Sequence, residues 1–512
     1  MKRSVFILVF TIFAAFAAPA QVNVGMTDTA SYYPLLRGRR VAVLANQTSV
    51  AEMPGAAGAD AAGRVHLVDL LHGEGFAVAA IFSPEHGFRG TADAGERVAS
   101  SVDARTGIPI RSLYDGNAKR PSDEAMRSFD VLVVDMQDVG LRFYTYYISM
   151  LRMMDACADF GRLVVVLDRP NPNGHLVDGP VLDMKYKSGV GAIPVPVLHG
   201  LTMGEIARMA VGEGWAKPCD LTVVKCRNYT HATEYLLPVA PSPNLPTARA
   251  VYLYAALCPF EGTVVSLGRG TDCPFEIYGH PDMTGRAFSF TPRPTAGAKH
   301  PPLEGRLCHG VDLRGMPLSE AREVGFSLRY VIDAYRDLGL GDRFFTPMFE
   351  KLVGAGWVRG MIVAGASEEA IRPAGFPMWN ATAKSGCSTC FTNRMMGFYV
   401  IARSCRRRGN PKKNAESAME SSYVYILTNK LHTVLYVGVT TSLSRRMKEH
   451  AAGQSAFTRR YNVHKLIYAE EYRDVRDAIA REKQIKSWSR KRKIGLIDSQ
   501  NSLWKDLSDG FV

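Results

Sequence analysis

The feature that most constrains this chain is a series of short apolar segments, each followed by polar residues. Continuous apolar runs of this length are typical of strands buried on both faces of a parallel sheet. Stretches with apolar residues at helical spacing, such as Tyr147–Phe160, separate them, so the pattern predicts strands alternating with helices. The four clearest segments occupy residues 40–45, 76–82, 131–134 and 163–167.

The second of these segments leads into Ser83-Pro84-Glu85-His86-Gly87. Pro84 has no amide hydrogen to give to a sheet ladder, so the strand ends before it. Glu85 and His86 then follow the carboxyl end of a strand, which is the edge at which open α/β sheets bind ligands. A glutamate next to a histidine, with a proline before them and a glycine after them, favours a catalytic pair over a polar loop that only covers the sheet edge.

The other predicted strands also end in polar residues. The carboxyl ends of parallel strands meet at one edge of a sheet, so these side chains should converge there. The residues expected at this edge are Asn46, Glu85, Asp135, Gln137, Asp138 and Asp168. The expected fold is therefore α/β, with a parallel sheet covered by helices on both faces.

From residue 241 onward the chain is richer in turns. Glu261, Arg269 and Glu276 lie in loops punctuated by glycines, and we expect them to form the second wall of a cleft. Either glutamate could instead cap a helix or accept hydrogen bonds from loop amides. A helical pattern then covers Ser319–Leu338, with the serine as its candidate N-cap.

The basic charge of the chain is concentrated towards its end. Residues 401–512 hold 23 lysines and arginines against 11 aspartates and glutamates, whereas residues 1–400 hold 39 against 38. The first part is therefore nearly neutral, and the asymmetry favours a polyanion as the partner of the C-terminal part alone.

The N-terminus has the pattern of a secretory signal. Lys2 and Arg3 precede an apolar run over residues 5–17, and Ala18-Pro19-Ala20 has the small-x-small pattern of a cleavage site. We expect residues 1–20 to be a signal peptide, cut after Ala20, and the mature chain to be periplasmic or secreted. The apolar run is too short to cross a bilayer and no later run is long enough, so no stable membrane span is expected.

Several common catalytic motifs are missing from the chain. No G-x-G-x-x-G follows the first strand, which disfavours a dinucleotide site. The sequence also has no P-loop, no H-E-x-x-H and no G-x-S-x-G. The sequence therefore lacks the usual motifs of nucleotide-binding proteins, metallopeptidases and serine hydrolases.

Six motifs together resemble the NamZ-type exo-β-N-acetylmuramidase family. They are Ser83-Pro-Glu-His-Gly87, Asp135-Met-Gln-Asp-Val-Gly140, Asp168-Arg-Pro-Asn-Pro-Asn-Gly174, Pro241-Ser-Pro-Asn244, Phe260-Glu-Gly-Thr263 and Gly268-Arg-Gly-Thr271. The resemblance implies a Rossmann-like catalytic lobe over residues 21–240, a smaller α+β lobe over residues 241–372, and a cleft between them. It also implies removal of terminal N-acetylmuramic acid from peptidoglycan fragments, with Glu85 as the catalytic acid.

The residues suit that chemistry. Glycoside hydrolysis needs a protonated carboxylic acid at the leaving oxygen and usually a second carboxylate. A partly buried glutamate can be the acid near neutral pH, which fits Glu85 with His86 beside it. Participation by the substrate's own acetamido group is an alternative to a second nucleophile. The candidates for the second carboxylate are Asp135, Asp138, Asp168 and Glu261.

N-acetylmuramic acid also carries a lactyl carboxylate, which a bidentate arginine recognises well. Arg142 and Arg269 are the candidates for this contact. Further substrate-binding candidates are the side-chain amides of the motifs, namely Asn46, Gln137, Asn173 and Asn244. No cofactor is expected for the glycosidase lobes.

The resemblance ends before the basic part of the chain. Members of the family usually finish with a tryptophan-containing helix and an aromatic-rich terminus, and residues 381–410 do not match that pattern. We expect residues 373–420 to be a basic linker or the product of a shifted reading frame.

A new arrangement of elements begins at residue 421. Apolar runs predict three strands, and two polar residues at helix starts predict two helices. The strands are expected over Tyr423–Thr428, Val434–Val439 and Lys465–Glu471, and the helices over residues 442–450 and 474–485.

These elements resemble a GIY-YIG nuclease domain over residues 421–512, especially the small stand-alone bacterial type. Val424-Tyr425-Ile426 matches the first triplet, with valine in place of glycine, and Tyr436-Val437-Gly438 matches the second. The run Ala480–Trp488 strengthens the match.

The resemblance implies a role for each matching residue of the tail. Tyr425 and Tyr436 would orient and activate the attacking water, Arg446 would stabilise the phosphate, and His450 would assist proton transfer. Glu482 would hold a divalent metal, such as Mg²⁺, for phosphodiester cleavage. Basic residues between positions 483 and 493 would grip DNA phosphates without reading sequence.

Two functions remain open at this point. The leading one is a secreted glycosidase acting on peptidoglycan fragments and carrying a DNA-cleaving tail. The alternative is a non-catalytic muropeptide-binding protein carrying a passenger DNA-binding domain. The oligomeric state does not follow from the sequence.

Overall fold

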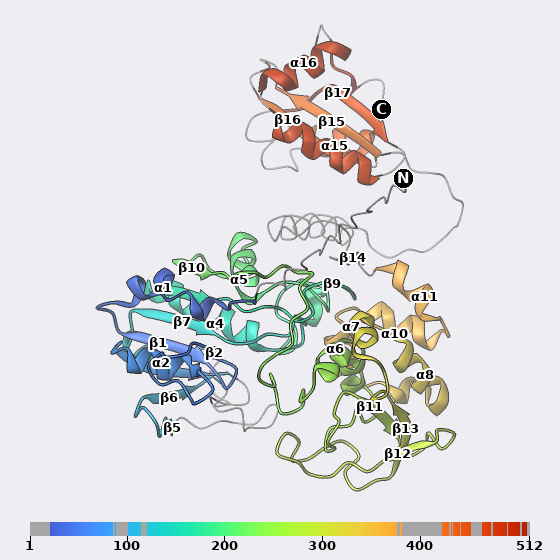
Figure 1. Ribbon diagram of the computed structural model, residues 1–512. Coiled ribbons are helices and arrows are strands. Elements are labelled where there is room, and N and C mark those ends of the chain that lie inside the picture. Colours follow the sequence, from blue (N-terminus) through green and yellow to red (C-terminus); the bar gives the residue numbers. More distant parts are fainter. Residues whose placement is uncertain are drawn as a thin grey trace, which may run out of the picture. The chain divides into compact units, whose positions relative to one another are not determined.

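The structure is a computed structural model, which divides into two compact units, residues 1–408 and residues 409–512 (Figure 1). The division falls inside the segment 373–420 that we expected to be a linker. The residues described are 21–84, 88, 101–113, 120–375, 379–380, 422–429, 432, 434–440, 442–451, 463–472, 475–488, 490–501 and 504–508.

The first unit is built on a seven-stranded sheet with the order β10-β8-β7-β1-β4-β6-β5. All neighbouring strands are parallel except β5 and β6. The four segments predicted as strands are β8, β7, β1 and β4, at the centre of the sheet, which confirms the predicted α/β fold. The strands are β1 (Val41–Ala45), β4 (Val78–Ser83), β5 (Ser101–Val102), β6 (Pro109–Ser112), β7 (Val131–Asp135), β8 (Leu163–Leu167) and β10 (Leu221–Val224).

Helices cover both faces of this sheet, as predicted. Leu132 and Val134 of β7 pack with α3, α4 and α5, whereas Val131 and Val133 pack with α1 and α2 on the other face. Burying one such side chain stabilises the folded state by about 1.5–3 kcal/mol. Burial on both faces therefore fixes the position of the strand, and of its carboxyl end, within the sheet. The helices are α1 (Thr29–Leu36), α2 (Leu67–Gly73), α3 (Asp123–Arg127), α4 (Tyr146–Phe160) and α5 (Met203–Gly212).

Short elements complete the first lobe. The strands β2 and β3 form an antiparallel hairpin, and β9 pairs with β14, which follows the second lobe in sequence. These elements are η1 (Gly25–Thr27), β2 (Val50–Glu52), β3 (Arg64–His66), β9 (Leu176–Val177), η2 (Met184–Tyr186) and β14 (Trp379–Asn380).

The second lobe is smaller and mixed, as predicted. A three-stranded antiparallel sheet of order β11-β13-β12 lies among its helices (Figure 1). Its buried side chains belong to the same hydrophobic cluster as those of α4, so the two lobes share one core. The elements are α6 (Ala248–Leu257), η3 (Cys258–Gly262), β11 (Ile277–His280), β12 (Phe288–Phe290), β13 (Cys308–Asp312), α7 (Leu318–Glu323), α8 (Arg329–Leu338), η4 (Gly341–Phe344), α9 (Met348–Val353), α10 (Gly356–Val363), α11 (Glu368–Ile371) and η5 (Arg372–Ala374).

The single helix predicted over Ser319–Leu338 is wrong. The structure has two helices there, α7 and α8, and the serine lies inside α7. Gly325 breaks the pattern with a φ of 65°, a conformation that favours glycine. Asp178 of the first lobe holds this turn, because its Oδ2 accepts a hydrogen bond from the Phe326 amide at 2.9 Å. A tertiary contact therefore overrides the local helical preference.

The second unit is a three-stranded antiparallel sheet of order β16-β15-β17 with helices on both faces. The three strands and two helices predicted for the tail are confirmed within two residues at each end. A further helix, α16, was not predicted. The elements are β15 (Ser422–Thr428), β16 (Leu435–Thr440), α13 (Leu443–Ala451), β17 (Lys465–Tyr472), α15 (Val475–Ser487) and α16 (Arg490–Gln500).

Within the described parts of the two units, no helix has both the length and the apolar character needed to cross a membrane.

Candidate functional site

The carboxyl edge of the seven-stranded sheet holds those of the predicted polar residues that the structure describes. Asn46 directly follows β1, Asp135 ends β7, and Asp168 directly follows β8. Since β1 is paired with β7, and β7 with β8, these residues lie along one edge. Glu85 and His86 lie outside the described residues, just beyond Ser83, with which β4 ends at the same edge.

Asp135 forms a buried ion pair with Arg169. The guanidinium donates from Nε to Oδ1 at 2.5 Å and from Nη2 to Oδ2 at 2.9 Å, and the two side chains are 0% and 2% exposed. Both carboxylate oxygens are therefore bound by one guanidinium, in the two-pronged geometry that makes such pairs specific. This pair ties the ends of β7 and β8 together and gives Asp135 a structural role.

Asp168 anchors α5. Its carboxylate accepts hydrogen bonds from the Thr202 hydroxyl at 2.7 Å and from the Gly204 amide at 2.8 Å, both at the first turn of the helix. A carboxylate at a helix N-terminus is stabilised by the unpaired amides and the helix dipole. Burial acts more strongly and raises the pKa of Asp168 to about 7. Its contacts join β8 to α5.

The carboxylate of Asp138 has fewer hydrogen bonds than those of Asp135 and Asp168. Its Oδ1 accepts a hydrogen bond from the Gly140 amide at 2.8 Å, while Oδ2 is buried and has no hydrogen-bond partner among the described residues. Burial raises the pKa of this carboxyl to about 7. The protonated form of Asp138, which can donate a hydrogen bond as well as accept one, is therefore favoured more than in an exposed aspartate.

The motif amides hold loops together. Gln137 donates from Nε2 to the Pro170 carbonyl at 2.7 Å, and Asn173 donates from Nδ2 to the Val139 carbonyl at 2.9 Å. Asn244 donates in the same way to a carbonyl of the second lobe, at 2.6 Å. These donors are engaged by the protein itself, so their amide nitrogens serve the scaffold.

Arg142 has a structural role in place of the substrate-binding role we expected. It is fully buried, and its Nη1 and Nη2 atoms donate to four carbonyls. Two of these carbonyls belong to the end of α9 in the second lobe, so the guanidinium joins the lobes and cannot reach a lactyl carboxylate. The acceptors, at 2.7–2.9 Å, are the carbonyl oxygens of Pro180, Val195, Leu352 and Val353.

Glu261 and Arg269 form an ion pair in the second lobe. Oε1 accepts from Nη2 at 2.6 Å and from Nε at 3.0 Å, and the side chains are 28% and 17% exposed. The guanidinium lies over Phe275, whose ring contacts Tyr254, which in turn contacts Tyr144 of the first lobe. A continuous set of rings therefore connects this partly exposed pair to the loop after β7.

Several buried polar atoms at the carboxyl edge have no hydrogen-bond partner among the described residues. They come from the ends of three adjacent strands, β4, β1 and β7. An unsatisfied buried polar atom costs about 1–3 kcal/mol, and such atoms are rare in native proteins. Their concentration here indicates a place for a polar ligand or for water. The atoms are Asn46 Nδ2, Ser83 Oγ, Gln137 Oε1 and Asp138 Oδ2.

Ser83 was not among the predicted site residues. It is fully buried at the end of β4, two positions before Glu85. The only sequence feature that points to Ser83 is its hydroxyl at the end of an otherwise apolar strand.

In the second unit, Tyr425 is the centre of a polar cluster. Its hydroxyl lies 2.9 Å from His450 Nε2 and accepts a hydrogen bond from Arg446 Nε at 3.2 Å. The Tyr436 ring centroid lies 5.3 Å from that of His450 and 6.3 Å from that of Tyr425. The structure thus brings four of the five predicted nuclease residues together.

Gly438 of the second triplet makes room for this cluster. A Cβ at that position would lie 2.5 Å from the Tyr425 hydroxyl and ring. Because β15 pairs Tyr425 directly with Gly438, no side chain can occupy the position without displacing the tyrosine.

Glu482 does not share in the described contacts of this cluster. It lies on α15, which packs with Val424 and Ile426, whereas Tyr425 lies on the face covered by α13. Its carboxylate pairs with Lys486 at 2.5 Å. Among the residues described in either unit, no three histidine, cysteine or acidic side chains form a ready metal site.

Comparison with known proteins decides the family. The N-terminal and C-terminal models of the exo-β-N-acetylmuramidase NamZ match residues 41–249 and 252–376. The peptidoglycan β-N-acetylmuramidase NamZ of Bacillus subtilis strain 168 is 38% identical over 397 residues, which covers 70% of this chain and 91% of that protein. The chain belongs to the NamZ exo-β-N-acetylmuramidase family.

Solved structures agree with the NamZ-family fold. A crystal structure of a DUF1343 family protein from Bacteroides fragilis NCTC 9343 is 49% identical, has a TM-score of 0.64, and covers 74% of this chain and 98% of its own. A second one from the same organism is 25% identical, with a TM-score of 0.58 and the same coverage.

The tail matches a different family. The GIY-YIG catalytic domain model matches residues 421–494. UPF0213 proteins of Natronomonas pharaonis and Clostridium perfringens are each 41% identical, over 76 and 81 residues, or 15% and 16% of this chain and 88% and 86% of theirs. Both parts of the chain are therefore similar to hydrolytic enzymes.

Proposed function

We propose that the NamZ-family part is an exo-acting glycoside hydrolase that releases terminal N-acetylmuramic acid from peptidoglycan fragments. The observation that carries this proposal is the position of Ser83, the first residue of the motif. Ser83 ends strand β4 at the sheet edge where buried polar atoms lack partners among the described residues. Membership of the NamZ family supports the same function.

Glu85 is the proposed general acid, with His86 beside it. Asp135 and Asp168 are bound to Arg169 and to α5, so they are poor candidates for the second carboxyl group. Asp138 suits a substrate-assisted reaction, in which its carboxyl orients the acetamido group instead of attacking the sugar. Glu261 is the other candidate, and its ion pair with Arg269 would have to open first.

The purified chain should therefore release free N-acetylmuramic acid from oligosaccharides that have this sugar at the non-reducing end. Oligosaccharides with N-acetylglucosamine at the non-reducing end should stay intact, because an exo-acting enzyme must recognise the terminal sugar that it removes. Mass spectrometry of the products measures both reactions. Tight binding of the muramyl oligosaccharide with no product after prolonged incubation would instead support the muropeptide-binding protein.

For the tail we propose metal-dependent cleavage of DNA. The clustering of Tyr425, Tyr436, Arg446 and His450 supports this function. Mg²⁺ is usually held by one or two carboxylates together with waters and substrate phosphates, so Glu482 alone can supply the protein ligand. The metal would supply charge stabilisation at the phosphate. Lys486 would have to release the carboxylate, since the two now form an ion pair.

In a plasmid-nicking assay with Mg²⁺, the full chain should cut DNA and Arg446→Ala should lower the rate about 100-fold or more, because the phosphate loses its charged donor. Glu482→Gln should lose the response to metal. Arg490→Ala is the matched control, since it removes a surface charge outside the cluster, and it should reduce binding only modestly. A tail that binds DNA and never cuts it, whatever divalent metal is supplied, would contradict the nuclease assignment.

We also propose that the chain is exported, on the strength of the charged and apolar pattern of residues 1–20, which lie outside the described residues. Fractionation of cells that express the chain with a C-terminal tag tests this. The tag should be found outside the cytoplasm, on a chain that begins at Gln21.

A further inference from the structure

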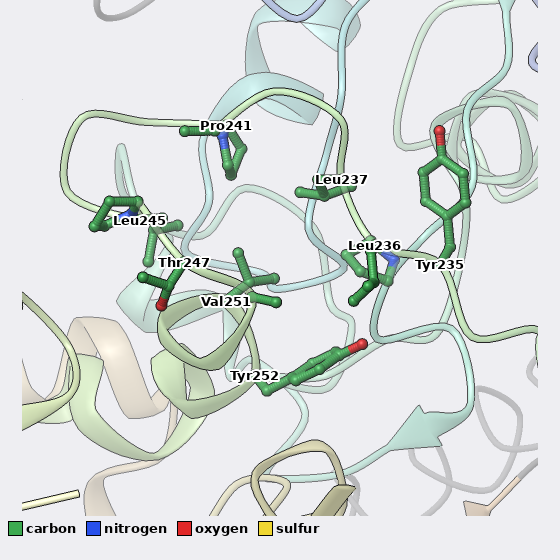
Figure 2. Close-up of a pocket in the computed structure, with 12 residues that line it drawn as sticks. Tyr235, Leu236, Leu237, Pro241, Leu245, Thr247, Val251 and Tyr252 are labelled. Atoms are coloured by element: carbon green, nitrogen blue, oxygen red, sulfur yellow. The ribbon is translucent and has the colours of Figure 1, made fainter. Parts of the chain in front are cut away.

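Two pockets of the first unit differ in size and in what lines them. The pocket beside α6, which Figure 2 shows between that helix and the loop over residues 235–241, holds about 70 Å³. The other holds about 460 Å³ and lies between the segment before β1 and the segment before β4. Ligand sites in proteins usually occupy about 300–1,000 Å³, so the second pocket has the room that a ligand needs.

This larger pocket lies at the amino edge of the seven-stranded sheet, and we call it the amino-edge pocket. Its lining comes from residues 33–40, which lead into β1, and from residues 74–77, which lead into β4. The two segments are joined where the Val41 amide donates to the Ala77 carbonyl at 2.8 Å. Since β1 has five residues and a strand rises about 3.3 Å per residue, roughly 16 Å separates this pocket from the carboxyl edge. The pocket is therefore distinct from the candidate active site.

Two arginines of the amino-edge pocket are available to a ligand. Arg37 and Arg39 are exposed, and neither side chain has a hydrogen bond or an ion pair with the described residues. Gly38 lies between them with a φ of 71°, a conformation that favours glycine, so the turn that presents both arginines depends on it. The neighbouring Arg40 is different, because Asp130 accepts from its Nε at 3.1 Å and from its Nη2 at 2.7 Å. The pocket thus offers two guanidinium groups that the described part of the protein leaves unused.

Much of the remaining lining is apolar. Tyr33 and Phe76 are half-buried, their ring centroids lie 4.8 Å apart, and the buried Leu36 also lines the pocket. Among the described lining residues, Glu74 is the one acid, whereas three are arginines. Aromatic side chains offer a large apolar contact area, and a guanidinium binds acidic groups. The pocket therefore suits a ligand that combines acidic groups with apolar ones.

The apolar part of the lining narrows the choice of ligand. A guanidinium binds carboxylate and phosphate in the same two-pronged way, so the arginines alone do not separate them. A phosphate polymer has no use for two aromatic rings, whereas a peptide can place methyl groups against them. The balance of the lining therefore favours carboxylates carried on a short peptide.

We propose that the amino-edge pocket binds a short acidic peptide, with its carboxylates on Arg37 and Arg39 and its apolar side chains against Tyr33 and Phe76. The proposal rests on the function proposed for the NamZ-family part, because peptidoglycan fragments carry short acidic peptides. The pocket holds such a fragment by its peptide, while the opposite edge of the sheet acts on a terminal sugar elsewhere in the polymer.

Isothermal titration calorimetry of the full chain with the free peptide L-alanyl-γ-D-glutamyl-L-lysyl-D-alanine tests this proposal. The peptide has no glycosidic bond, so its binding does not depend on turnover. The double variant Arg37→Ala with Arg39→Ala should bind it at least tenfold more weakly, because charge-assisted contacts are lost. The same peptide with its carboxylates converted to amides should lose affinity by a similar factor. Arg208→Ala is the matched control, since Arg208 is an exposed arginine on α5, and it should bind the peptide as the wild type does.

The double variant Arg37→Lys with Arg39→Lys keeps both charges but loses the two-pronged contacts, so it should regain part of the affinity. All variants should melt at the temperature of the wild type, because the substituted side chains are exposed. Wild-type affinity in the double alanine variant, or equal binding of the amidated peptide, would overturn the proposal. Displacement of the peptide by inorganic tripolyphosphate that binds more tightly would also overturn it, in favour of a phosphate ligand. Failure of the hydrolytic function would appear separately, as wild-type protein that binds the peptide and releases no sugar.

Discussion

Asp135→Ala is expected to lower the free energy of unfolding of the first unit by about 3–5 kcal/mol, because it leaves the Arg169 guanidinium buried without its partner. Asp135 and Arg169 are 0% and 2% exposed, so water cannot replace the lost carboxylate without opening the sheet edge. The urea midpoint of the main transition measures the loss. Asp123→Ala is the control, because Asp123 pairs with Arg120 at the surface, and it should cost at most about 1 kcal/mol.

The double variant Asp135→Leu with Arg169→Met separates loss of charge from loss of packing. Replacing both partners with apolar side chains of similar size removes the unpaired charge, so much of the stability should return. A single Asp135→Ala variant as stable as its parent would show that the pair does not hold β7 to β8.

The strands could be predicted because burial on both faces leaves a continuous apolar signal. Residues 131–134 and 163–167 have no polar side chain in the sheet interior, and each is followed by an aspartate at the edge. The parallel order then brings those aspartates together. Prediction from the sequence was therefore good for the fold and for the position of the edge.

The roles of the edge residues could not be predicted in the same way. Asp135, Asp138 and Asp168 look alike in sequence, and what separates them is a guanidinium, an unpaired oxygen and a helix N-terminus. Arg169 and the first turn of α5 belong to neighbouring segments, and only the folded sheet brings them next to Asp135 and Asp168. Asp135 and Asp168 at this edge are bound within the scaffold, which their sequence context does not distinguish from a catalytic role.

Arg142 shows the same limit over a longer distance. Its carbonyl acceptors on α9 lie 210 and 211 residues away in sequence, and no local pattern predicts them.

The polar cluster of the tail could be predicted from the sequence, because the two triplets lie on paired strands. The register of β15 with β16 sets Tyr425 opposite Gly438, so the short motif already contains the geometry of the cluster.

The second large effect is expected from Glu85→Gln. Glutamine keeps the size and the hydrogen-bonding capacity of the side chain but cannot give a proton to the leaving oxygen, and loss of a general acid typically costs a factor of 10²–10⁴. The melting temperature should be unchanged, so a loss of activity could not be attributed to unfolding. Glu74→Gln, an exposed glutamate at the end of α2, is the matched control and should keep full activity.

The most direct measurement is the rate at which wild type, Glu74→Gln and Glu85→Gln release the chromophore from a chromogenic β-N-acetylmuramide. The wild type and Glu74→Gln should hydrolyse it equally fast, and Glu85→Gln should be slower by about 10³-fold at the same melting temperature. Wild-type activity in Glu85→Gln would contradict the assignment of the catalytic acid and, with it, the proposed role of this sheet edge.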